Sequence, residues 1–142
     1  MMNIDKNFVP ASIDEGDEYF PNGIFVFNIT KMLKFINENT SDIECGTISV
    51  EKYRRELSNI NESYLDSVDL TSPVILAEIC PGMYNLIDGH HRIEKAYRMG
   101  LESIPAYKLK ARQHIQFLTS IETYRSYVEY WNSKIADGHK PF

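Results

Sequence analysis

The pattern of apolar and polar positions divides the first half of the chain into short strands and helices. Residues 23–29 (GIFVFNI) form a compact run of β-branched and aromatic residues, which predicts a buried strand. Residues 30–39 place apolar side chains at helical spacing behind Thr30, a residue type that can cap a helix. We expect a loop at residues 40–47, and then a strand or turn that leads into a helix within residues 48–60.

A β-hairpin followed by a helix is predicted in the second half. Residues 73–79 (PVILAEI) are almost continuously apolar, residues 81–83 (PGM) favour a turn, and residues 84–88 (YNLID) alternate as a returning strand. A helix then begins after Gly89 and ends near Gly100, where a glycine is typical of a helix C-terminus.

A strand and a helical segment complete the predicted elements. Residues 101–110 (LESIPAYKLK) predict a strand with Pro105 near its start or at a sheet edge. Within residues 112–137, apolar side chains recur at steps of three and four, which predicts one long helix or two shorter ones.

These elements predict a single mixed α/β (α+β) domain. The chain has 142 residues, of which 43% are hydrophobic, and this is enough for one core. Residues 1–22 are polar, acidic and interrupted by prolines, so we expect them to form a loosely held, irregular arm. The domain proper is then expected at residues 23–142.

Charge and cysteine content limit the classes of partner. The 15 basic and 20 acidic residues give a net charge of −5, which disfavours DNA as a partner, although Lys108, Lys110 and Arg112 make a local basic group. The only cysteines, Cys45 and Cys80, do not form a C-x-x-C pair, so they predict buried free thiols and neither a disulfide framework nor a zinc finger.

The terminus and the hydropathy pattern predict a cytoplasmic protein without a membrane segment. The N-terminal sequence has no basic stretch followed by an apolar core, as a signal peptide would. No apolar run approaches the roughly 20 residues that a membrane helix needs.

The turn at residues 88–92 (DGHHR) carries the candidate chemistry. A helix that starts after a glycine turn presents unpaired backbone N–H groups, and its dipole attracts anions, so the turn is a candidate phosphate site. Arg92 can add a forked donor, while His90 and His91 can donate hydrogen bonds or exchange protons. The alternative for the two histidines is a solvated helix start. A joint metal site of His90 and His91 is disfavoured, because adjacent helical side chains point about 100° apart.

Asp88 brings a negative charge to this predicted phosphate site. Such a charge is costly beside a phosphate unless the carboxylate binds Mg²⁺, accepts a substrate proton or caps the helix. All three roles remain open for Asp88 at this point.

Residues 72–109, which include this turn, resemble the conserved part of the ParB/sulfiredoxin superfamily. The ParB branch carries G-E-R-R at the turn, of which only Arg92 matches, and the catalytic cysteine of sulfiredoxin is replaced by His90. The form D-G-H-H-R is similar to a third branch, which includes free-serine kinases and proteins described as ParB-like nucleases.

That resemblance implies a nucleotide site. Gly89, His90, His91 and Arg92 would hold the phosphates, and Asp88 would act beside a Mg²⁺ ion as an acid or base. The family implies a second catalytic acid in the N-terminal half, for which Glu51 and Glu56 are candidates.

Three functions follow from the sequence. The first is a nucleotide-dependent phosphotransferase or hydrolase in which Asp88, His90 and His91 are the catalytic candidates. The second is a ParB-like DNA-binding protein or nuclease. The third is a non-catalytic interaction module of the immunity or antitoxin type, suggested by the aromatic tail, which contains Tyr127, Tyr130 and Trp131.

Overall fold

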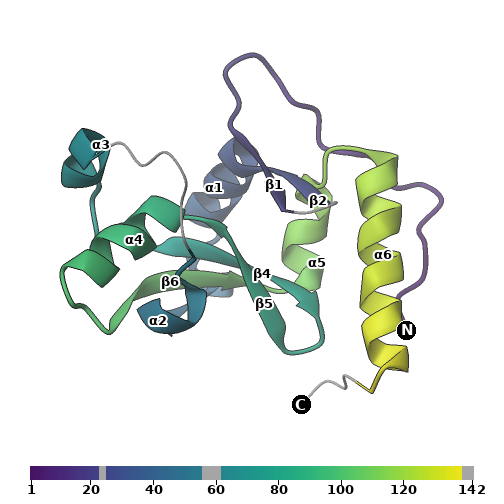
Figure 1. The fold of residues 1–142 in the computed structure, drawn as a ribbon. Coiled ribbons are helices and arrows are strands. Elements are labelled where there is room, and N and C mark those ends of the chain that lie inside the picture. Colours follow the sequence, from purple (N-terminus) through teal and green to yellow (C-terminus); the bar gives the residue numbers. More distant parts are fainter. Residues whose placement is uncertain (23–24, 56–61, 139–142) are drawn as a thin grey trace.

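A four-stranded sheet organises the fold of the computed structural model, which describes residues 1–22, 25–55 and 62–138 (Figure 1). Its strand order is β3-β6-β4-β5, in which β4 and β5 form an antiparallel hairpin and β4 and β6 run parallel. A separate pair of strands, β1 and β2, is antiparallel. The strands are β1 (Tyr19–Asn22), β2 (Phe25–Asn28), β3 (Glu44–Ser49), β4 (Val74–Cys80), β5 (Met83–Asp88) and β6 (Ser103–Leu109).

Helices pack on both faces of this sheet, so the described residues form the mixed α/β fold that the sequence predicts. Successive residues of β4 enter two apolar clusters: Ile75 and Ala77 pack with α1, β2 and α6, whereas Val74 and Leu76 pack with α2 and α4. Burial on both faces explains why this strand is apolar throughout. The helices are α1 (Ile29–Glu38), α2 (Val50–Tyr53), α3 (Glu62–Ser67), α4 (His90–Arg98), α5 (Ala111–His114) and α6 (Ile121–Ala136).

The predicted hairpin, turn and helix are confirmed. Strands β4 and β5 pair over the expected residues, β5 ends at Asp88, and α4 begins directly after Gly89. Helices α5 and α6, with a 3-10 turn at Ile115–Phe117 between them, form the predicted helical segment near the end of the chain. No helix in the described part of the chain is long and apolar enough to cross a membrane.

The loop predicted at residues 40–47 is wrong. A 3-10 turn at Thr40–Asp42 and the edge strand β3 occupy this region. Only Ile48 of β3 is buried, so the strand lacks the apolar alternation that would have revealed it, and its pairing with β6 determines its conformation. The predicted helix that follows begins at Val50 as α2, and Leu57 and Ile60, which would have extended it, lie outside the described residues.

The N-terminal arm is more regular than predicted, because its residues 19–22 form β1. The rest of the arm is held against the domain: the Asp5 N–H donates to the Tyr124 hydroxyl at 2.7 Å, and Phe8 stacks on the Tyr124 ring with centroids 4.0 Å apart. Figure 1 shows the arm running from the end of α6 over the top of the molecule to β1.

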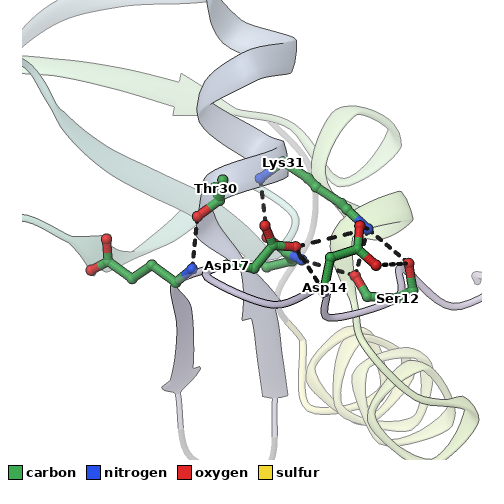
Figure 2. Close-up of polar contacts among 7 residues, drawn as sticks. Ser12, Asp14, Asp17, Thr30 and Lys31 are labelled. Carbon is green, nitrogen blue, oxygen red and sulfur yellow. Dashed lines mark hydrogen bonds and ion pairs between the residues drawn. The ribbon is translucent and has the colours of Figure 1, made fainter.

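Asn28, and not Thr30, caps helix α1. Its side-chain oxygen accepts from the Lys31 N–H at 3.0 Å, while the Thr30 hydroxyl accepts from the Glu18 N–H at 2.7 Å (Figure 2). The first turn of α1 therefore forms hydrogen bonds with the Asn28 cap and with the arm.

Two further expectations are resolved at single residues. Pro105 lies in β6 before Ala106, where pairing with β4 begins, so it occupies a stretch that is paired only with β3. Cys80 is buried, but the prediction of a buried thiol is wrong for Cys45, which is exposed on the edge strand β3.

Candidate functional site

Gly89 gives the turn between β5 and α4 its shape. Its φ of +110° lies in the left-handed region, and it is the N-cap of α4 without a side-chain cap hydrogen bond. A Cβ atom here would lie 2.3 Å from Val74 Cγ1 and 2.8 Å from Val74 Cβ. Backbone conformation and space therefore both require glycine at the point where β5 ends and α4 begins.

A small cavity of about 270 Å³ opens at this helix N-terminus. Residues 88–91 form one wall, and the other walls come from Glu18, Phe20 and Arg55. The first N–H groups of an α-helix have no acceptor within the helix, so those of α4 are available to a ligand at this end. The cavity thus combines helix donors, a guanidinium group and two carboxylates.

Arg55 projects from a backbone that its neighbour Arg54 fixes. The Arg54 Nε donates to the buried Glu94 carboxylate at 3.1 Å, and its guanidinium lies 4.0 Å from the centre of the Tyr97 ring. Arg54 thus joins the end of α2 to the middle of α4, and the next residue, Arg55, lines the cavity at the α4 N-terminus.

His90 is a partly buried, neutral ring in the cavity wall. Burial is the main cause that lowers its pKa to about 4, and the positive charges of Arg55 and His91 lower it further. At neutral pH the ring is therefore uncharged and can donate one hydrogen bond. The positive charge of Arg55 therefore lies close enough to act on this ring.

His91 lies on the outer side of the same turn. Its ring is exposed and meets Tyr64 edge-on, with centroids 4.9 Å apart. The structure thus brings His90 and His91 to one cavity but gives them different surroundings: His90 is partly buried and His91 is exposed.

The Arg92 guanidinium forms hydrogen bonds with two other parts of the chain. Its Nη1 donates to the carbonyl oxygens of Ser72 at 3.1 Å and Pro73 at 2.6 Å, and its Nη2 donates to Asp88 Oδ2 at 2.9 Å. The side chain lines a second cavity of about 460 Å³, on the α3 side of the turn. Arg92 therefore joins the end of β5 to the segment before β4, and Arg55 is the guanidinium that lines the smaller cavity.

Asp88 lies between the two cavities and lines both. Because Gly89 is the N-cap and has no side-chain cap bond, the capping role considered for Asp88 is not what the structure shows. Its carboxylate is oriented by Arg92 instead, an arrangement that holds an acid or base in one rotamer.

The described residues bear on two more predictions, a metal ion and a second catalytic acid. They contain no group of three His, Cys, Asp or Glu side chains placed to hold a metal ion. Glu51, a candidate second acid, lines a separate groove beside α2, and Glu56 lies outside the described residues. Glu18 is the acid that lines the cavity with Asp88.

Sequence reasoning did not find Glu18, Phe20 or Arg55. Each is at least 33 positions from Asp88 in the chain, and no local spacing connects them to the turn. They reach the cavity through the pairing of β1 with β2 and through the Arg54–Glu94 contact, which are both tertiary features.

The aromatic tail contributes to the core. Tyr127 is fully buried, and its hydroxyl donates to the Glu78 carbonyl oxygen at 2.6 Å. Tyr130 and Trp131 are partly buried against the same apolar cluster. The packing of Tyr127 therefore removes it from any surface that an interaction partner could contact.

The chain matches no protein-family model, no curated protein and no solved structure. The resemblance of residues 72–109 to the ParB/sulfiredoxin superfamily therefore stays a prediction.

Proposed function

We propose that the chain binds a phosphate-bearing ligand, either a nucleotide or a smaller phosphate compound, in the cavity at the N-terminus of α4. The observation that carries this proposal is the meeting of the α4 N-terminus with the Arg55 side chain in one cavity. Helix N–H groups and a guanidinium are the donors that phosphate oxygens use most effectively. After burial, the charge of Arg55 is the next cause that lowers the pKa of His90, so this guanidinium acts close to the α4 N-terminus.

The proposed reaction is transfer or hydrolysis of a terminal phosphate. In such reactions the protein chiefly positions the reactants and stabilises charge on the phosphate oxygens. The α4 N–H groups and Arg55 would hold those oxygens, and neutral His90 would donate one further hydrogen bond. Asp88, oriented by Arg92 at 2.9 Å, would accept the proton of the attacking hydroxyl group or water.

Magnesium is part of this proposal. Mg²⁺ is usually bound by one or two carboxylates together with substrate phosphates, and Asp88 and Glu18 are the carboxylates that line the cavity. A bound ion would neutralise charge on the phosphate. It would also offset the repulsion between these carboxylates and an anionic ligand.

The two other functions have less support. A net charge of −5 disfavours DNA, because neutralisation of phosphates supplies most non-specific DNA affinity. The interaction module was suggested by the tail, in which Tyr127 is buried in the core.

Calorimetric titration of the protein with phosphate, pyrophosphate, ADP, ATP and CTP, each with and without Mg²⁺, tests the proposal. Replacing Arg55 with alanine should weaken binding by about 1.5–3 kcal/mol, which is roughly a 10- to 100-fold change in dissociation constant. The matched control is Arg125→Ala, which removes an exposed arginine from α6. Equal affinities for wild type and Arg55→Ala, or no binding of any compound, would refute the proposal.

A further inference from the structure

The phenyl ring of Phe20 lies against His90 in the wall of the proposed phosphate cavity. It stacks on the His90 ring with centroids 5.2 Å apart and an angle of 26° between the planes, and both residues line the cavity. The cavity is partly open to solvent, and its volume of about 270 Å³ is just below the roughly 300–1,000 Å³ of typical small-molecule sites. The position of Phe20 therefore limits what the cavity can hold.

Backbone hydrogen bonds fix the strand that carries Phe20. Strand β1 pairs with β2, with Phe20 opposite Phe27. Just before β1, the Glu18 N–H donates to the Thr30 hydroxyl at 2.7 Å, and the Glu18 carbonyl oxygen accepts from the Ile29 N–H at 2.9 Å. Phe20 is thus held by the start of α1 and by β2.

Side chains of the arm strengthen this attachment, as Figure 2 shows. Asp17 accepts from the amide of the buried Asn28 at 2.8 Å, and Lys31 Nζ donates to the Ser12 carbonyl oxygen at 2.6 Å and pairs with Asp14 at 3.1 Å. These contacts join residues 12–17 to the first turn of α1. Strand β1 is consequently a fixed wall of the cavity.

We propose that Phe20 determines the size of the ligand. With β1 in place, the cavity admits compounds of the size of phosphate or pyrophosphate, and a nucleoside triphosphate enters only when Phe20 moves away from His90. The inference rests on the proposed function, because it concerns the same cavity, and it identifies small phosphate compounds as the preferred ligand class.

Titration of wild type, Phe20→Ala and Tyr19→Ala with pyrophosphate and with ATP tests this inference. Tyr19 precedes Phe20 in β1 and is exposed, so its replacement controls for changes in the strand itself. Wild type and Tyr19→Ala should prefer pyrophosphate, and Phe20→Ala should shift the affinity ratio towards ATP by roughly tenfold or more. An unchanged ratio, or weaker ATP binding in Phe20→Ala, would overturn the role of Phe20 and leave the phosphate site standing.

Measuring the pKa of His90 by NMR tests whether Phe20 shields this ring, and it needs no ligand. Loss of the Phe20 ring should expose His90 and raise its pKa from about 4 towards the ordinary value of 6.5, whereas Tyr19→Ala should not change it. An unchanged pKa in Phe20→Ala would show that Phe20 does not shield the His90 ring. Absence of binding of both compounds in every variant would overturn the proposed function and the size selection together.

Discussion

Arg92 and Asp88 form an ion pair across the turn that begins α4, with Nη2 and Oδ2 2.9 Å apart. Only about a fifth of each side chain is exposed, and the same guanidinium also binds the carbonyl oxygens of Ser72 and Pro73. The pair therefore fixes the geometry of the turn as well as the orientation of the proposed acid or base.

Replacing Arg92 with alanine should lower the free energy of unfolding by about 1.5–3 kcal/mol, because charged hydrogen bonds to Asp88 and to two carbonyl oxygens are lost. A residue that only contacted a ligand would leave the fold almost unchanged. Urea unfolding of Arg92→Ala measures the difference, with the exposed Arg112→Ala as the control. Equal stability of the two variants would show that these bonds add nothing to the fold.

Replacing Gly89 with alanine should destabilise the protein by about 2–5 kcal/mol, because the strain of a positive φ adds to a clash with Val74. Gly100 offers a matched control: its φ of +74° is also positive, but a Cβ atom there meets nothing within 4 Å. Gly100→Ala should therefore cost only about 1–2 kcal/mol. Thermal unfolding of both variants gives the comparison, and similar losses would contradict the close packing at Gly89.

The stability of the fold should fall between pH 7 and pH 5. Burial lowers the pKa of His114 to about 4, and its Nε2 lies 2.7 Å from the Glu78 carbonyl oxygen. Below pH 6.5 the unfolded chain binds a proton that folded His114 does not, so stability decreases by up to about 1.4 kcal/mol per pH unit. His90, whose pKa is also lowered to about 4, acts in the same direction.

The variant His114→Gln separates the contribution of His114. Glutamine keeps an N–H donor near the position of Nε2 and does not titrate, so the decrease in stability from pH 7 to pH 5 should be smaller than in wild type. Urea unfolding at several pH values measures the slope, with the same replacement at exposed His91 as the control. A slope equal to that of wild type would contradict the burial of a neutral His114.

Replacing Asp88 with asparagine tests the proposed acid or base. Asparagine still offers Arg92 an acceptor oxygen, so the turn should persist, and loss of the negative charge should tighten metal-free binding of phosphate. Turnover of a bound phosphate compound should be abolished, because the amide does not accept a proton. Full turnover in Asp88→Asn would remove Asp88 from the reaction.

Much of the fold could be predicted where apolar periodicity was strong. The hairpin of β4 and β5, the helix after Gly89 and the helical segment near the end of the chain lie at the predicted places. Strand β3 was missed because its residues are mostly exposed and its only strong constraint is pairing with β6, which lies more than 50 positions away in the chain.

The site could be predicted only in its local part. Asp88, Gly89 and His90 do lie at one cavity, because consecutive residues of a turn must stay together. Two other features depend on tertiary contacts: Arg92 holds residues 72–73, and Phe20 and Arg55 line the cavity. Sequence spacing carries no information on such contacts, so it assigned to Arg92 the role that we now propose for Arg55.

The measurement that tests the central proposal most directly is an NMR titration of the backbone amides with pyrophosphate and Mg²⁺. If the ligand binds at the N-terminus of α4, the N–H signals of His90, His91 and Arg92 should shift most, and in Arg55→Ala the same shifts should need roughly 10- to 100-fold more ligand. Largest shifts at the groove lined by Glu51 and Tyr97, or no saturable shifts at all, would contradict a phosphate site at this turn.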